Sequence, residues 1–167
     1  RHGHCPSYIP AVGDIDQDGR DEVCGGYYLI DDDGAVLWEE ALANHMDSVA
    51  VAPWDNGRVR AVCSGFGHVL DEHGNALIAL GQEAVPHGQE VRVARFYADD
   101  PDPQMVIRYR GHTPDVMVVD TEGKIRQHFE LNPSHNNTGM EPVYWDGPDQ
   151  PSRLYNGGML WNVAKKE

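Results

Sequence analysis

Four similar segments recur along the chain, and this repetition limits the possible folds more than any other feature. The segment VCGGYYLIDDDGAVLW begins at Val23 and matches VCSGFGHVLDEHGNALI from Val62 and VIRYRGHTPDVMVVDTEGKI from Val106. A shorter copy, LYNGGMLWN, begins at Leu154. Short apolar runs that are split by Gly and Asp turns, with a period in the forties, are typical of β-propeller blades. A histidine precedes each copy, at spacings of 41, 42 and 48 residues: His4, His45, His87 and His135.

Each copy divides into four predicted strands, which for the first copy are residues 7–13, 22–26, 28–31 and 35–40. The turns DDDGA, DEHGN and DTEGK place Gly where a hairpin needs a positive φ. No long segment has the apolar spacing of a helix. The sequence therefore predicts an all-β fold, a β-propeller of four-stranded antiparallel blades. A β-solenoid and a β-sandwich with accidental repetition are the alternatives.

The predicted blades divide the chain at about 4–44, 45–86 and 87–134, followed by a partial blade at 135–167. A closed propeller needs about four to eight blades, so these three and a half blades do not close by themselves. We therefore expect the chain to be a piece of a longer protein. The remaining blades of that parent chain are then its nearest partner.

The charge of the chain excludes some classes of partner. The sequence of 167 residues has 27 acidic against 13 basic side chains, a net charge of -14. Nucleic acids and anionic membrane surfaces would be repelled, and no apolar run is long enough to span a bilayer. This composition suits a secreted or periplasmic protein that binds divalent cations. Three cysteines do not make a disulfide framework, and Cys24 and Cys63 are predicted to be small buried residues at equivalent places in the repeat.

The stretch GDIDQDGRDE, residues 13–22, has the composition of a calcium loop. Alternate carboxylates, a Gly for the sharp bend and a late acidic ligand are the parts of a loop with spacing like that of an EF-hand. The loop connects the first two strands of the first predicted blade, away from the propeller axis, so we expect a structural calcium ion. An empty Asp-rich turn is the alternative. The predicted ligands are Asp14, Asp16, Asp18, the carbonyl of Arg20, and Glu22.

Histidines gather on the opposite face of the predicted propeller. The repeated histidines lie in the loops that enter each innermost strand, and two further histidines, in GFGH and YRGH, lie in loops on the same face. The alternative is that they are structural and bond to neighbouring blades. The candidate catalytic residues on this face are His45, His87, His68, His112, His135, Arg108, Tyr109 and Arg110.

Histidine can act as a base or an acid near neutral pH, and arginine pairs with carboxylates. Together with an acid such as tyrosine, these groups suit β-elimination from a uronic acid. A glycoside hydrolase would instead need two carboxylates across the sugar. Several histidines could also bind a metal ion. Tyr109 alternates with Arg110 along a strand, so it could point into the core.

The stretches GDIDQDGRDEV and YYLIDDDGAVLW resemble the calcium-bearing blades of rhamnogalacturonan lyases. The later stretches RYRGHTP and NNTGMEPVYW are similar to propeller-type lyases of rhamnose–uronate polysaccharides, including ulvan lyases and rhamnose–glucuronate lyases. The resemblance covers nearly the whole chain. It implies a secreted β-eliminating enzyme that acts on an acidic polysaccharide, with bound calcium and a groove across one face.

The same resemblance implies that histidine and tyrosine serve as base and acid and that arginine faces the uronate carboxylate. Carried onto this chain, it makes His45 and His87 the leading bases and Arg110 the leading partner of the carboxylate, ahead of Arg108. His68, His112 and His135 are further candidates, and the acid could lie in the missing blades. Two other functions stay open: a non-catalytic, calcium-binding, integrin-like module that binds sugar or protein, and a metal-dependent hydrolase.

Overall fold

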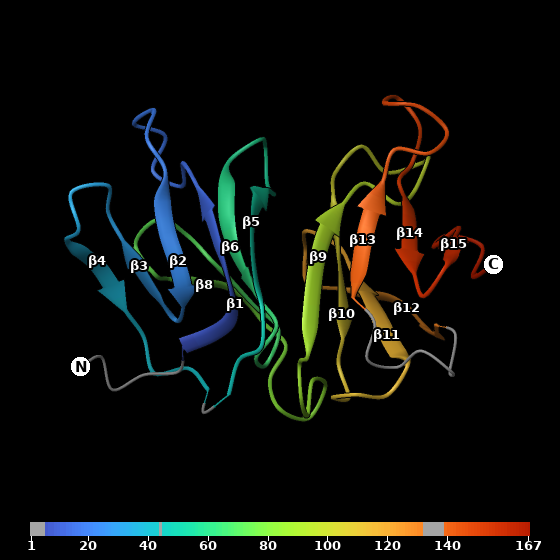
Figure 1. Ribbon diagram of the computed structural model, residues 1–167, viewed down its shortest axis with the longest axis horizontal. Coiled ribbons are helices and arrows are strands. Elements are labelled where there is room, and N and C mark those ends of the chain that lie inside the picture. The colour runs from blue at the N-terminus through green and yellow to red at the C-terminus, as the bar shows by residue number, and fades with distance from the viewer. Residues whose placement is uncertain (1–5, 44, 132–138) are drawn as a thin grey trace.

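The computed structural model describes residues 6–43, 45–131 and 139–167, and all regular structure in these ranges is β-strand (Figure 1). The strands form four separate antiparallel sheets in which strands adjacent in sequence are hydrogen-bonded. The predicted all-β fold of blade-like antiparallel sheets is therefore confirmed. No helix in the described ranges could cross a membrane.

The first two sheets each have four strands. The first contains β1 (Pro6–Gly13), β2 (Glu22–Gly26), β3 (Tyr28–Ile30) and β4 (Val36–Glu39). The second contains β5 (Val49–Pro53), β6 (Val59–Cys63), β7 (His68–Leu70) and β8 (Ala76–Ala79).

The other two sheets follow the same order. The third contains β9 (Glu90–Ala94), β10 (Gln104–Arg108), β11 (Asp115–Val119) and β12 (Ile125–Glu130). The fourth has three strands in the described residues: β13 (Met140–Val143), β14 (Arg153–Asn156) and β15 (Met159–Trp161). The first strands of successive sheets contact one another, β1 with β5, β5 with β9, and β9 with β13.

The core is divided into three clusters, and each cluster lies between two neighbouring sheets. Leu29 and Trp38 of the first sheet pack against residues of the second such as Leu70. The second cluster joins the second and third sheets, and the third joins the third and fourth. Since successive side chains of a strand point to opposite faces, a sheet packed on both sides needs apolar residues on both faces. The nearly continuous apolar runs of the sequence supply them.

Cys24 and Cys63 are both buried, as predicted, but they are not equivalent. Both belong to the cluster between the first two sheets, so they lie on faces that look toward each other. Val62, one residue before Cys63, faces the third sheet and is the structural counterpart of Cys24. The hairpin of β1 and β2 is one residue longer than that of β5 and β6, since Ala11 pairs with Cys24 whereas its counterpart Ala50 pairs with Val62.

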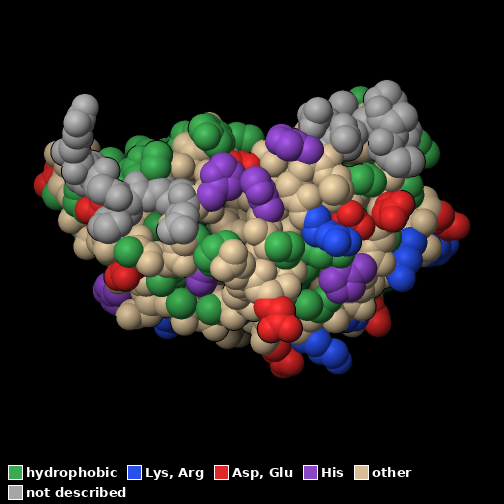
Figure 2. Space-filling view, turned by 90° about the horizontal axis from the view of Figure 1, so that it is seen from below, with side chains coloured by type: hydrophobic (Ala, Val, Ile, Leu, Met, Phe, Trp, Pro, Cys, Tyr) green, Lys and Arg blue, Asp and Glu red, His purple; other side chains and the backbone are tan. Residues whose placement is uncertain are grey.

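The loops separate into two ends of the molecule. The loop between β1 and β2 lies at the top of Figure 1, whereas the segments that enter β5 and β9 lie at the bottom. Figure 2 views the molecule from that lower end and shows several histidine side chains close together, with basic and acidic side chains beside them. We call this lower end the histidine face.

Candidate active site

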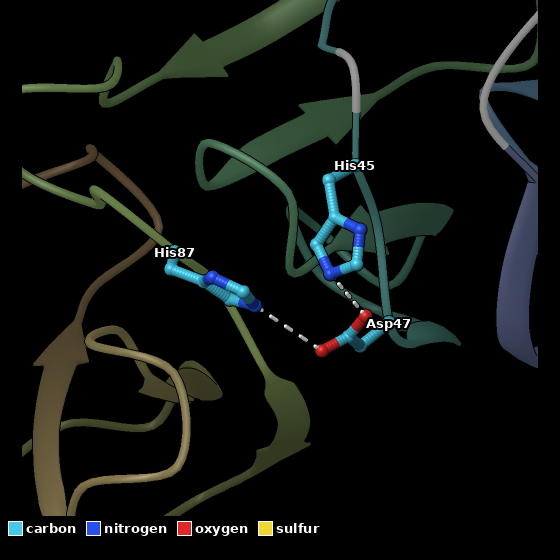
Figure 3. A group of neighbouring side chains, drawn as sticks. All are labelled: His45, Asp47 and His87. Carbon is cyan, nitrogen blue, oxygen red and sulfur yellow. Dashed lines mark ion pairs between the residues drawn. The ribbon is translucent and has the colours of Figure 1, made fainter.

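Two histidines from neighbouring sheets meet at one buried carboxylate on the histidine face (Figure 3). His45 Nε2 lies 2.6 Å from Asp47 Oδ1, and His87 Nε2 lies 3.6 Å from Asp47 Oδ2. The imidazole rings are in edge-to-face contact, with centroids 4.6 Å apart. The His45 and His87 side chains are 46% and 45% exposed, whereas that of Asp47 is 4% exposed. The His45–Asp47–His87 group therefore offers two accessible imidazoles beside a carboxylate that solvent does not reach.

Backbone hydrogen bonds hold His87 on both sides. Its N–H donates to the Tyr109 carbonyl (3.1 Å), and its carbonyl accepts from the N–H of Gly111 (2.7 Å). The next residue, Gly88, donates to the Gly65 carbonyl (3.2 Å). A Cβ on Gly88 would lie 1.7 Å from the carbonyl oxygen of Ser64, so this position must be glycine. His87 is thus fixed between the second and third sheets.

The backbone of Asp47 is held by the first sheet. Its carbonyl accepts from the N–H of Ile9 (2.9 Å), and Ser7 Oγ lies 3.1 Å from the same oxygen. Asp47 is not among the site residues that the sequence predicts. The only signal for it was an acidic residue two positions after the repeated His45, in an apolar context.

The loop that follows β10 lies beside His87 and brings Arg110 and His112 to the histidine face. Both residues are exposed, and a short parallel bridge pairs His87 with Arg110. Tyr109 is partly buried, and its ring contacts that of His128, with centroids 5.2 Å apart. The structure therefore brings Arg110 and His112 into the neighbourhood of His87, while Tyr109 turns partly into the core.

Arg108 lies in the core instead of on the histidine face. It is 2% exposed and opposes Glu90 across the pair β9–β10. Burial lowers the pKa of Arg108, and the charge of Glu90 acts in the opposite direction. Burial also raises the pKa of Glu90, whose Oε1 accepts from the N–H of Met140 (3.0 Å) and pairs with Arg92 (2.9 Å). These contacts join the third and fourth sheets, so a substrate in solvent does not reach Arg108.

His68 also lies below the surface. Its Nδ1 is 2.8 Å from the hydroxyl of Tyr27, and the two rings meet edge to face. The contact joins the first two sheets, and burial lowers the pKa of His68. His68 is therefore separate from the His45–Asp47–His87 group. His4 and His135 lie outside the described residues.

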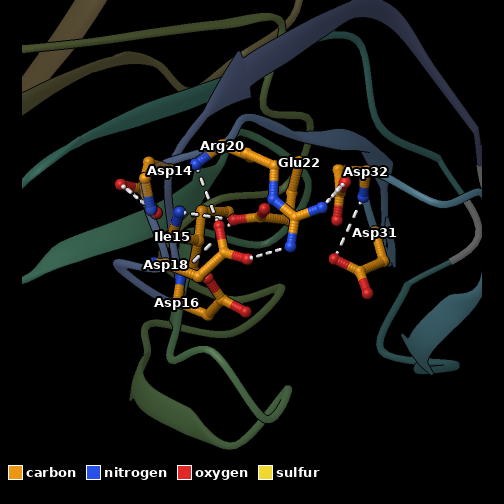
Figure 4. Close-up of polar contacts among 9 residues, drawn as sticks. Asp14, Ile15, Asp16, Asp18, Arg20, Glu22, Asp31 and Asp32 are labelled. Carbon is orange, nitrogen blue, oxygen red and sulfur yellow. Dashed lines mark hydrogen bonds and ion pairs between the residues drawn. The ribbon is translucent and has the colours of Figure 1, made fainter.

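The acidic loop lies at the opposite end and folds around its own carboxylates (Figure 4). Glu22 Oε2 accepts from the N–H of Ile15 (2.7 Å), and Asp14 Oδ2 accepts from the N–H of Gly19 (3.1 Å). The other oxygens, Glu22 Oε1 and Asp14 Oδ1, are buried and have no hydrogen-bond partner among the described residues. Burial raises the pKa of Glu22, whereas the N–H of Ile15 lowers it. Four carboxylates in the loop, of Asp14, Asp16, Asp18 and Glu22, lie close enough to share one metal ion.

In each of the first three sheets, an arginine pairs with acidic residues in the turns of its own sheet at the end that carries the acidic loop. Arg60, which is buried, lies 2.7 Å from Asp55 and 2.5 Å from Glu72, and it lowers the pKa of Asp55. Arg20 pairs with Asp18 and Asp32, but it is exposed and approaches the acidic loop from the outside. In the third sheet, Arg126 pairs with Asp100 (2.9 Å) and lies 3.9 Å from Asp120.

Comparisons with known proteins relate the chain to others by fold. No family model matches the sequence, and no curated protein matches it. The structure is similar to that of a Bacillus licheniformis rhamnogalacturonan lyase, with a TM-score of 0.73 and 17% identity, over 96% of this chain and 27% of that one. It is also similar to rhamnogalacturonan lyase YesW, with a TM-score of 0.66 and 18% identity, over 96% of this chain and 30% of that one.

A third similar structure is the Vibrio cholerae biofilm matrix protein Bap1, with a TM-score of 0.57 and 17% identity. That match covers 76% of this chain and 21% of Bap1. The chain thus spans less than a third of the length of any of these proteins. At such low identity the likeness shows a shared fold and identifies neither an activity nor a substrate.

Proposed function

We propose that the chain is part of a polysaccharide lyase that cleaves rhamnose–uronate polysaccharides by β-elimination. The observation that carries this proposal is the His45–Asp47–His87 group, with Arg110 on the adjacent loop. The fold shared with rhamnogalacturonan lyases supports it. Such polymers are too large to enter a cell, so we also propose that the protein acts outside the cytoplasm.

The proposed reaction begins with the uronate carboxylate. Arg110 pairs with this carboxylate and makes the neighbouring C5 proton more acidic. One imidazole of the pair removes that proton, and the electrons form a double bond between C4 and C5. The bond from C4 to the glycosidic oxygen breaks, and an acid protonates the departing oxygen.

In this proposal, contact with Asp47 lets one imidazole act as the base and the other as the acid. An imidazole that faces the carboxylate through Nε2 carries its proton there when neutral, so its Nδ1 is left with a lone pair that can act as the base. The second imidazole, when protonated, has its charge stabilised by the same carboxylate and can act as the acid. We favour this imidazole over Tyr109, since the tyrosine ring is partly buried against His128.

The test is an assay of the full-length protein on rhamnogalacturonan, ulvan and a rhamnose–glucuronate gum. We expect the ultraviolet absorbance of the unsaturated uronate to rise on at least one polymer. New reducing ends without this absorbance would indicate hydrolysis, and a metal ion on the His45–Asp47–His87 group would then be sought, because its three ligand atoms lie within 4.8 Å of one another. If neither signal appears on any of these polymers, the lyase proposal fails.

A non-catalytic module that binds polysaccharide through the histidine face is the second candidate. The similarity to the biofilm matrix protein Bap1 favours it. An integrin-like module would carry acidic loops in most sheets, whereas within the described residues the four-carboxylate group occurs in the first sheet. Polymer binding without cleavage in the same assay would support the module.

We propose that the acidic loop binds one calcium ion with a structural role. The ligand set fits calcium, since four carboxylates converge and two of them have buried oxygens without partners among the described residues. The carbonyl of Arg20 completes the proposed set. In the second and third sheets, the guanidinium groups of Arg60 and Arg126 already neutralise carboxylates of the turns. We therefore expect one calcium site in the described residues, in the first sheet.

Calcium is therefore expected to stabilise the chelator-treated protein. A ligand at a hundred times its Kd adds about 2.7 kcal/mol to the free energy of unfolding, and thermal unfolding with and without calcium measures the effect. Asp16→Asn should remove most of this response. The matched control is Asp21→Asn, which removes the same charge from an exposed position of the same loop. Equal responses in the two variants, or no response in the unaltered protein, would contradict the proposal.

A further inference from the structure

We infer that Ser48 is a positioning residue for the two histidines. It fixes the backbone of Asp47 and ties it to the strand that follows His87. The inference rests on the proposed function for its kinetic consequence, but its structural consequence can be measured independently of any reaction.

Every polar group of Ser48 is used within the protein. The side chain is fully buried, and its Oγ accepts a hydrogen bond from the N–H of Val91 in β9 (2.8 Å). Its N–H donates to Ser64 Oγ (3.0 Å), and its carbonyl accepts from the N–H of Ser64 (2.9 Å). Ser48 therefore joins β9 of the third sheet to the end of β6 in the second, directly beside Asp47. Buried hydrogen bonds of this kind define a single geometry, because breaking one leaves an unpaired polar group.

The same place in the repeat makes the same kind of connection elsewhere. Ser7, Ser48 and Glu90 each lie three residues after a repeated histidine of the sequence. Ser7 Oγ is 3.1 Å from the Asp47 carbonyl, and Glu90 Oε1 accepts from the N–H of Met140 (3.0 Å). In each case a polar side chain at the beginning of one sheet contacts the beginning of the next. The position is thus a connector between sheets, and at Ser48 the two connected segments carry the two histidines.

The hydrogen bond between Ser48 and Val91 can affect catalysis because His87 is only four residues before Val91. If the hydrogen bond between Ser48 and Val91 is lost, the beginning of β9 can shift relative to Asp47. The contact from His87 to Asp47 is already the longer of the two, 3.6 Å against 2.6 Å for His45. A small shift would separate the second imidazole from the carboxylate. Displacements of about 1 Å in a catalytic arrangement can reduce the rate by about a hundredfold.

The test compares Ser48→Ala with Ser152→Ala in the full-length protein. Ser152 is also buried, but its Oγ has no hydrogen-bond partner among the described residues, and it lies directly before β14 of the fourth sheet. Both variants remove one buried hydroxyl, so the comparison isolates the connection. Two quantities are measured: the nitrogen-15 chemical shifts of the imidazoles of His45 and His87, which report the tautomer, and kcat and KM for elimination.

For Ser48→Ala, we expect the imidazole shifts to move toward the average of the two tautomers. We also expect kcat to fall by about tenfold to a hundredfold, with a smaller change in KM. Ser152→Ala should leave both quantities as in the unaltered protein. Unchanged shifts and kcat in folded Ser48→Ala would overturn the inference.

Two further outcomes are decisive. If Ser48→Ala does not fold, Ser64→Ala removes the partner of the Ser48 N–H and is judged by the same measurements. If the unaltered protein shows no elimination, the proposed function fails, and the imidazole shifts alone decide whether Ser48 positions the histidines.

Discussion

His87→Gln in the full-length protein is expected to reduce the rate of uronate elimination by about a hundredfold to ten-thousandfold, the usual contribution of a general acid or base. Glutamine is polar and similar in size, but it neither accepts nor donates a proton near neutral pH. His87 is exposed and its backbone is held by Tyr109 and Gly111, so the substitution should leave the fold intact. The initial rate of the absorbance increase measures the effect.

His73→Gln is the matched control for this prediction. His73 is an exposed histidine in the turn between β7 and β8, away from the His45–Asp47–His87 group. Its replacement should leave the rate unchanged. A His87→Gln protein that keeps most of its activity would show that His87 does not transfer the proton, and His45 would then be examined in the same way.

Gly88→Ala is expected to destabilise the protein by about 3 kcal/mol or more, toward the upper end of the cost of overpacking. The added Cβ would lie 1.7 Å from the Ser64 carbonyl oxygen and 2.7 Å from that of Gly65. Both atoms belong to the backbone, so no side-chain rotation can relieve the contact. A protein whose total stability is about 5–15 kcal/mol would lose a large part of it. Urea unfolding monitored by tryptophan fluorescence measures the change.

Gly139→Ala provides the comparison, because a Cβ there would meet Glu90 Oε1 at 3.5 Å, an ordinary contact. Its cost should be well below that of Gly88→Ala. Similar stabilities for the two variants would mean that the second and third sheets can separate locally around His87, although backbone hydrogen bonds hold it on both sides.

The fold was predictable from the sequence because the repeat directly encodes it. The Gly and Asp turns and the alternating apolar runs fix the strands locally, and β2 has the predicted bounds, Glu22–Gly26. Likewise, strand direction alone places the loops that contain His45, His87 and His112 at one end of the sheets. These features depend on short-range geometry, so a single sequence carries them.

The sequence did not predict which candidate residues are buried or which residues contact them. Whether His68 reaches solvent depends on the partner that it meets across the gap between sheets, which is Tyr27, 41 positions earlier in the chain. Arg108 is buried because Glu90 opposes it, and no local pattern specifies that pairing. Asp47 is a site residue because β1 holds its backbone and His87, before β9, meets its carboxylate. Each of these depends on tertiary packing between sheets.

The division of the core into clusters between neighbouring sheets also affects how such a chain can change during evolution. A duplication or loss of one whole sheet alters only the interfaces at its two sides and leaves the others as they were. The side chains of the His45–Asp47–His87 group meet between the second and third sheets, and the first sheet holds the backbone of Asp47. Lineages can therefore gain or lose sheets beyond these three and keep this group, whereas a whole sheet inserted between the second and third would separate its two histidines.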